Sequence, residues 1–122
     1  MRKFLLHILI ISFVFILAPT AQVATYAGAI EDAREEVRNN PDDADAHNNL
    51  GIAYGELGKH EEAIKSYKQA IRLDPDDAEA NYNLGVAYLL LKDRSSALEQ
   101  YKILKNLDPE KANELFDLIY SE

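Results

Sequence analysis

The sequence predicts an all-α protein, an α-solenoid of antiparallel helical hairpins stacked side by side. The segment 44–77 returns from Ala78 onwards with many of the same residues in the same order. Pro41, Pro75 and Pro109 keep this period, since 75 − 41 and 109 − 75 are both 34. Self-similarity of this kind is typical of stacked hairpins, in which each unit buries its apolar face against its neighbours. Such a stack presents a surface and contains no reaction centre.

Residues 44–77 form the first expected repeat, which has two helices. Apolar and small residues recur every three or four positions over 45–57, which is the helical period. The two aspartates before this helix can cap its free N–H groups, and Gly58 ends it. The second helix is expected over about 61–73 and must end before Pro75, because a proline disfavours helical geometry in the residue before it.

Residues 78–109 form the second expected repeat, with Asp76 and Asp77 as its caps. Its two helices follow the same pattern of apolar positions: Ala80, Leu84, Ala87, Tyr88 and Leu91, then Ala97, Leu98, Tyr101, Leu104 and Leu107.

The small, aromatic and proline positions of both repeats carry a family resemblance. They are Leu50, Gly51, Tyr54, Gly58, Ala63, Tyr67, Ala70 and Pro75, then Leu84, Gly85, Tyr88, Ala97, Tyr101 and Pro109. In these residues the chain resembles tetratricopeptide repeat proteins, and the resemblance implies a binding groove lined by the first helix of each hairpin.

Several positions depart from that family pattern. His47 and Asn81 stand where the family has Trp or Tyr, and Lys92 replaces the glycine of the turn. Leu104 replaces a small alanine, and extra methylenes in a packed helix crossing normally cost about 1 to 3 kcal/mol. We therefore expect Leu104 to face something other than another standard repeat, as in the atypical last repeat of an array.

Both ends of the array are expected to be covered. Residues 110–122 should form a C-terminal cap helix that covers the second repeat with Leu115, Leu118 and Ile119. Residues 28–41 should form a half-repeat helix at the other end, with Ile30, Ala33 and Val37 as its sealing side chains. Two full hairpins are about the minimum for an independent solenoid.

The segment 1–27 lies outside the repeats and has the pattern of a signal peptide. Arg2 and Lys3 precede an apolar run over 4–17, and small residues follow it. This order is typical of an export signal, and the run is shorter than the roughly 20 residues of a membrane-spanning helix. We expect an exported protein of the periplasm or bacterial cell envelope; the alternative is a retained anchor in the inner membrane formed by residues 4–17.

The composition disfavours most chemical functions. The chain has 21 acidic and 13 basic residues and a formal net charge of −8, whereas nucleic-acid binding needs clustered Lys and Arg. It has no cysteine. His47 and His60 lack the spacing of a metal site, and no phosphate loop or nucleophile motif is present. We therefore expect no enzyme activity, no metal and no cofactor.

The groove positions give the candidate site. The resemblance places the following first-helix residues in the groove: Asp45, Asn48, Asn49, Ile52 and Glu56, then Glu79, Tyr82, Asn83, Val86 and Leu90. Asn49 and Asn83 are equivalent, and two amides one repeat apart could hold the backbone of an extended peptide. An asparagine at this position could equally serve local structure. Acidic residues in the groove disfavour an acidic C-terminal tail as the ligand.

Two functional hypotheses follow. In the first, the chain is an interaction module that binds a peptide or helix of an envelope protein in its groove, for example as an assembly adaptor. The excess of acid is compatible with a basic partner, although most of these carboxylates fit helix caps and solvated faces. In the second, the chain is a structural subunit, a homo-oligomer that self-associates through its repeat ends or groove.

Overall fold

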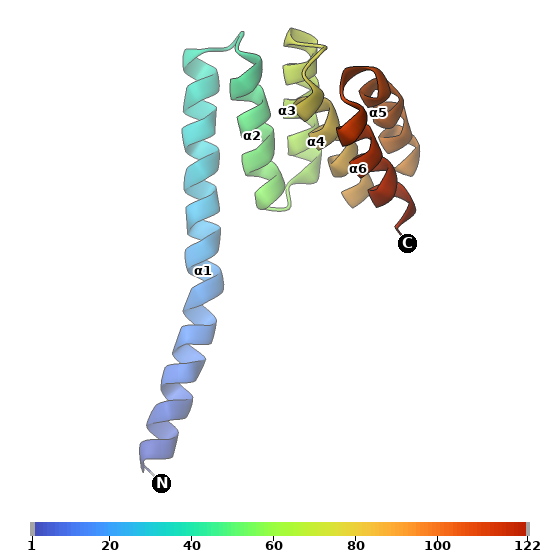
Figure 1. Cartoon of the computed structure of the whole chain (residues 1–122). Coiled ribbons are helices and arrows are strands. Elements are labelled where there is room, and N and C mark those ends of the chain that lie inside the picture. Colours follow the sequence, from blue (N-terminus) through green and yellow to red (C-terminus); the bar gives the residue numbers. More distant parts are fainter. Residues whose placement is uncertain (1, 122) are drawn as a thin grey trace.

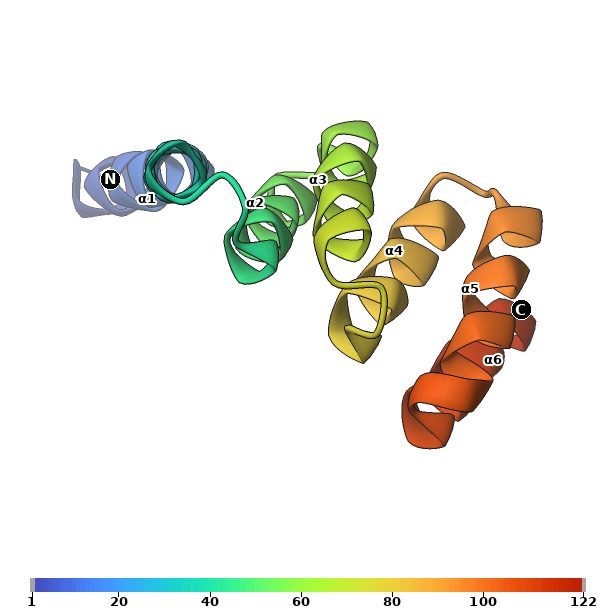
Figure 2. The same ribbon diagram turned by 90° about the horizontal axis from the view of Figure 1, so that it is seen from above.

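The computed structural model describes the backbone of residues 2–121 and the side chains of residues 20–121. The described backbone forms six α-helices: α1 (Arg2–Asn39), α2 (Ala44–Glu56), α3 (His60–Leu73), α4 (Ala78–Leu90), α5 (Arg94–Leu107) and α6 (Pro109–Tyr120). Figure 1 shows α2 to α5 following one another in chain order, with α6 packed against α4 and α5 and with α1 alongside α2 and extending beyond it. Seen from above, the helices form a row from α1 at one end to α5 and α6 at the other (Figure 2). The all-α solenoid is confirmed.

The hairpin of α2 and α3 falls within the segment expected for the first repeat. The Asp43 carboxylate caps α2 by accepting a hydrogen bond from the Asp45 N–H at 3.0 Å. Gly58, in the turn, has a φ of +77°, a left-handed conformation that glycine adopts without steric cost. At the crossing, Gly51 lets the Tyr67 ring approach so closely that an added Cβ would lie 2.5 Å from the ring.

The hairpin of α4 and α5 repeats this arrangement with other residues. Asp77 caps α4 by accepting from the N–H groups of Glu79 and Ala80. In the turn, Lys92 takes the left-handed conformation with a φ of 64°, where the first repeat has glycine. Asp93 caps α5 by accepting from the Ser96 N–H at 3.0 Å and the Ser96 hydroxyl at 2.6 Å, and these bonds lower the pKa of its carboxyl group.

Each hairpin is also tied to the turn that precedes it. His47 Nε2 lies 2.8 Å from the carbonyl oxygen of Pro41, and the Asn81 amide donates to the carbonyl of Pro75 at 3.3 Å. These two residues occupy the position at which the family has a large aromatic side chain. A polar side chain here therefore forms the same link across the turn in both repeats.

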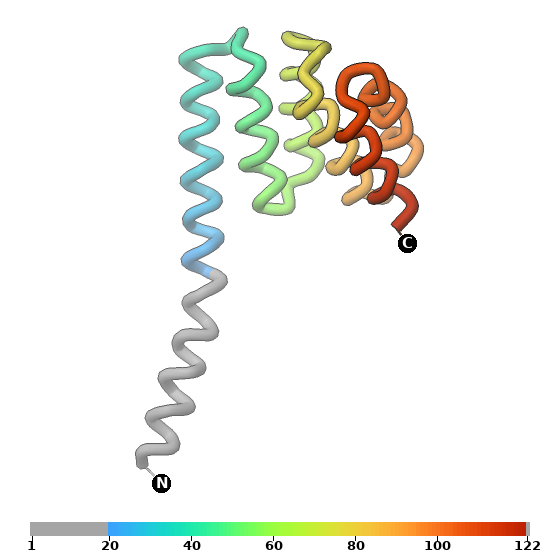
Figure 3. The backbone as a smooth tube through the Cα atoms, viewed as in Figure 1, coloured from blue at the N-terminus to red at the C-terminus, as the bar shows by residue number. Residues whose placement is uncertain are grey.

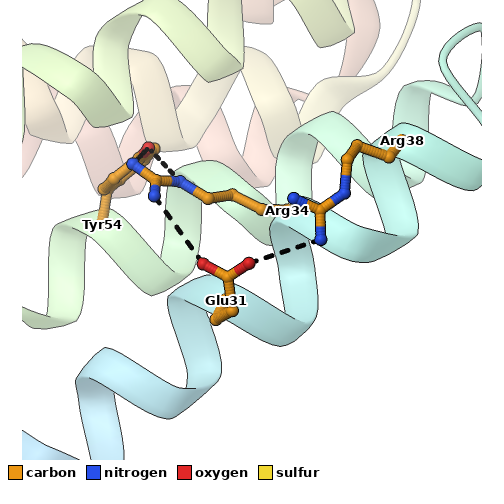
Figure 4. Close-up of polar contacts among 4 residues, drawn as sticks. All are labelled: Glu31, Arg34, Arg38 and Tyr54. Carbon is orange, nitrogen blue, oxygen red and sulfur yellow. Dashed lines mark hydrogen bonds and ion pairs between the residues drawn. The ribbon is translucent and has the colours of Figure 1, made fainter.

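The N-terminal end of the array is sealed by the residues expected from the sequence. Ile30 and Ala33 are buried, and Val37 packs against the same core cluster, which includes Leu50 and Tyr54. A polar link adds to this contact (Figure 4). The Arg34 guanidinium donates to the Tyr54 hydroxyl at 3.0 and 3.1 Å, while Glu31 accepts from Arg38 at 3.3 Å.

The C-terminal end is covered by α6. Leu104 is completely buried in a cluster with Ala112, Leu115 and Ile119, so it faces the cap helix, as its size suggested. The expectation that Leu118 belongs to this covering face is wrong, because its side chain is 45% exposed. Successive residues of an α-helix point about 100° apart, so Ile119 turns inward and Leu118 does not.

The predicted signal or anchor lies mostly outside the described side chains. Figure 3 colours residues 20–121. None of the helices, over their described residues, combines the length and apolar character needed to cross a membrane.

Candidate partner-binding groove

A groove lies between the first hairpin and α4 and encloses a cavity of about 300 Å³. Its wall is formed by residues of α2, α3 and α4: Ile52, Gly55, Glu56, His60, Ala63, Tyr67, Asn83, Val86, Ala87 and Leu90. Five of these were predicted from the sequence, namely Ile52, Glu56, Asn83, Val86 and Leu90. The cavity is mainly apolar and has a few polar groups on its wall, which is the usual character of a ligand site.

The second helix of the hairpin contributes residues that the sequence argument did not assign to the groove. Ala63 and Tyr67 have the helical spacing of core residues, and they are buried in the core as well as lining the cavity. His60 also lines the cavity, and its Nδ1 atom is buried without a hydrogen-bond partner among the described residues. The position of His60 at the start of α3, directly after the turn, is the sequence signal that could have identified it.

Asn48 differs from the prediction. It is buried, 6% exposed, and its Oδ1 accepts a hydrogen bond from Asn83 Nδ2 at 3.2 Å. The amide of Asn83 is therefore already engaged across α2 and α4. Asn48 lies beneath the surface of the groove, where it joins the two first helices.

The remaining predicted residues lie outside the cavity wall. Asn49 and Glu79 are exposed, and Asn49 does not share the environment of its equivalent, Asn83. Tyr82 packs against the cluster around α6. Burial raises the pKa of the Tyr82 hydroxyl, and the Glu114 carboxylate raises it further. Tyr82 therefore belongs to the contact between α4 and the cap helix.

The electrostatics of the cavity are acidic. Burial raises the pKa of Tyr67 to about 12, and the negative charges of Glu56 and Glu79 contribute to the rise. Both carboxylates therefore act on the same hydroxyl at the wall of the cavity. The wall includes Glu56 but no Lys or Arg among its described residues, so a cationic group is favoured there over an anionic one.

A metal site is not formed by the described side chains. Among residues 20–121, no group of three His, Asp or Glu lies close enough to hold a metal ion. The described wall of the groove offers hydrogen-bonding groups, apolar contact and the negative charge of Glu56.

Comparison with protein families identifies the class of protein. Models described as tetratricopeptide repeat match residues 34–65 and 79–117, and a model described as TPR repeat matches residues 54–92. The chain belongs to the tetratricopeptide repeat family, as its 34-residue period and stacked hairpins indicate. No curated protein sequence matches it.

Solved structures similar to this chain include TPR domains in complex with a partner. The TPR2B domain of yeast Sti1, in a complex named for pHsp70, has a TM-score of 0.73 and 27% identity over 80% of this chain and 82% of its own. The second TPR domain of human RPAP3, in complex with the HSP70 peptide SGPTIEEVD, has a TM-score of 0.72 and 28% identity over 79% and 82%.

MamA is a further similar structure. It has a TM-score of 0.72 and 28% identity, and the match covers 79% of this chain and 57% of MamA. Together, the fold and the family define the chain as a protein-interaction scaffold.

Proposed function

We propose that the chain is a non-enzymatic module that binds a peptide segment of a partner protein in the groove between the first hairpin and α4. The observation that carries this proposal is the open cavity of about 300 Å³, which has an apolar wall, a carboxylate and an amide. The peptide complexes of Sti1 and RPAP3 support it, because those domains share the fold.

The preferred peptide differs in charge from the RPAP3 ligand. The RPAP3 ligand SGPTIEEVD ends in EEVD and is acidic. In this chain, Glu56 lines the cavity and Glu79 lies near the Tyr67 hydroxyl, so an acidic tail would meet like charge. A peptide with an apolar side chain for the cavity and a basic residue beside Glu56 fits the groove better.

Selection of displayed peptides on the full-length chain tests the proposal. We expect the selected sequences to combine apolar and basic residues and to bind a Glu56→Gln variant more weakly. Glu61→Gln is the matched control, because Glu61 is exposed on α3 and does not line the cavity. Equal affinity of the parent chain and both variants would contradict binding in this groove.

A substitution of Asn83 does not test peptide binding alone, because this side chain also bonds to Asn48. Replacing Asn83 by Ala would remove about 0.5 to 1.5 kcal/mol for a lost hydrogen bond to the peptide, but it would also leave the buried Asn48 oxygen unpaired. Asn49→Ala is the better amide test because this side chain is exposed. If the peptide backbone bonds to Asn49, that variant should weaken binding by a similar amount with unchanged stability.

A structural, self-associating role is the second candidate, and exposed apolar groups favour it. Phe116, Leu118 and Tyr120 on α6 are 41%, 45% and 51% exposed. Sedimentation across a range of concentrations separates the two roles. A monomer at all concentrations supports the adaptor, and a stable oligomer that Phe116→Ser dissociates supports the structural subunit.

We also propose that the protein is exported to the periplasm or cell envelope. The support is the order of charged, apolar and small residues over 1–27. Mass spectrometry of the natural protein should find its first residue between Thr20 and Gly28. An intact N-terminus in the membrane fraction would instead support the anchor formed by residues 4–17.

A further inference from the structure

A second cavity, of about 270 Å³, adjoins the groove. It is lined by Leu89, Lys92, Arg94, Leu118 and Ile119. The first cavity is lined by Leu90 and the second by Leu89, two consecutive residues in the last turn of α4. Both cavities therefore border the same turn of α4.

The second cavity is the counterpart of the first, one repeat further along the array. Arg94 follows His60 by 34 residues, since 94 − 60 is 34, and Leu89 follows Gly55 by the same interval. The charge is different at the two places. The first wall includes the carboxylate of Glu56 and no Lys or Arg, whereas the second includes Lys92 and Arg94 and no carboxylate among its described residues.

Arg94 is held in a position to receive an anion. Its guanidinium lies 4.8 Å from the centre of the Tyr120 ring, an arrangement that orients the group without neutralising it. The neighbouring carboxylate of Asp93 is occupied by Ser96. Arg94 forms no ion pair with another of the residues 20–121. A carboxylate of a ligand can therefore form the charge-assisted hydrogen bonds that Arg94 does not form with the residues 20–121.

We propose that one peptide occupies both cavities, with an apolar side chain in each, a basic residue beside Glu56 and an acidic residue beside Arg94. This inference rests on the proposed binding function and adds the identity of the ligand: a segment whose charge changes from basic to acidic across an apolar centre. The turn of α4 that carries Leu89 and Leu90 then separates the two apolar side chains.

Four capped peptides with the same apolar centre test the charge pattern. They carry Lys at both ends, Glu at both ends, or one of each in either order, and their affinities for the full-length chain are measured by calorimetry. We expect one of the two mixed peptides to bind most tightly, by about three- to tenfold over the peptide with Lys at both ends, as for a charge-assisted bond at a partly exposed site.

Variants assign each charge to its cavity. Arg94→Gln should remove the preference for Glu at the acidic end, and Arg94→Glu should transfer it to the peptide with Lys at both ends. Arg72→Gln is the matched control, because Arg72 is an exposed arginine that lines neither cavity and bonds to Gln69. Arg94 is exposed, so we expect these variants to melt within a few degrees of the parent chain.

The outcomes distinguish this inference from the binding function itself. If Glu56→Gln weakens binding while Arg94→Gln behaves as Arg72→Gln does, the peptide occupies the first cavity only and the inference is wrong. If none of the four peptides binds, or if neither Glu56→Gln nor Arg94→Gln changes affinity, both proposals fail.

Discussion

The two repeats share one backbone plan and differ in what lies against them. In the first, Ala70 is fully buried on α3, which packs against α4 of the next repeat. In the second, Leu104 occupies the equivalent position and is buried against α6. The period therefore determines where the helices begin and end, while the neighbour determines the size of the side chain at each crossing.

The glycines and turns of the two repeats show the same difference. An added Cβ at Gly51 would meet the ring of Tyr67 on its own partner helix, whereas one at Gly85 would meet the tip of Leu115 on α6. The turn has Gly58 in the first repeat and Lys92 in the second, both at positive φ. The second repeat thus depends on the cap helix and carries a strained residue in its turn.

Removal of the cap helix, on which the second repeat depends, should lower the free energy of unfolding more than any other change proposed here. Deleting residues 110–122 removes the burial of Leu115 and Ile119 and exposes Leu104. At about 1.5 to 3 kcal/mol for each of these three large side chains, we expect the free energy of unfolding to fall by roughly 4.5 to 9 kcal/mol. Urea unfolding measures this, with Asp117→Ser as a control expected to stay within about 0.5 kcal/mol, because Asp117 is exposed on α6. An unchanged midpoint after the deletion would mean that α6 is not docked.

The two glycine crossings should respond unequally to the same substitution. Gly51→Ala places a methyl group 2.5 Å from a rigid aromatic ring, and we expect a loss of about 1 to 3 kcal/mol. Gly85→Ala places it 2.6 Å from a terminal methyl of Leu115, which can rotate, and alanine improves helix propensity. A comparison of their urea midpoints should therefore show the smaller loss for Gly85→Ala. Equal losses would show that the two crossings are equally rigid.

The turns should respond in opposite directions. Lys92→Gly relieves a left-handed lysine, which costs about 1 to 2 kcal/mol, and part of this gain is offset by the greater freedom of glycine in the unfolded chain. We expect a gain of about 1 kcal/mol from Lys92→Gly and a comparable loss from Gly58→Ala. Differential scanning calorimetry checks both variants. A lower melting temperature for Lys92→Gly would show that the left-handed conformation of Lys92 does not destabilise the fold.

The smallest expected effect at neutral pH concerns Tyr67, whose ionisation matters only above about pH 10. A tyrosine ionises near pH 10 in the unfolded chain, whereas Tyr67 does so at about 12 in the fold. Because the unfolded state loses this proton first, the free energy of unfolding should decline as the pH rises from about 10 to 12. Tyr67→Phe keeps the ring and should make that decline shallower. An identical pH profile for the variant would exclude Tyr67 as its source.

The helices of the first hairpin could be predicted from the sequence to within one residue, because prolines, caps and helical spacing are local signals. The helices expected over 45–57 and 61–73 are Ala44–Glu56 and His60–Leu73. The residues that line the groove were harder to predict, because helical spacing does not show whether a residue faces the groove or is buried against a neighbouring helix. Asn48 and Asn49 are neighbours in sequence, yet only the contact with Asn83 on α4 decides that Asn48 is the buried one. Tyr67 serves the core and the cavity together, which spacing alone cannot show.

The links from His47 to Pro41 and from Asn81 to Pro75 have a mechanical consequence for the array. A hydrogen bond has a narrow optimum in length and direction, unlike the contact of a large aromatic side chain. Twisting one hairpin against the preceding turn would stretch the 2.8 Å bond of His47 or the 3.3 Å bond of Asn81. Each of these two hydrogen bonds therefore resists rotation of its own hairpin against the turn that precedes it.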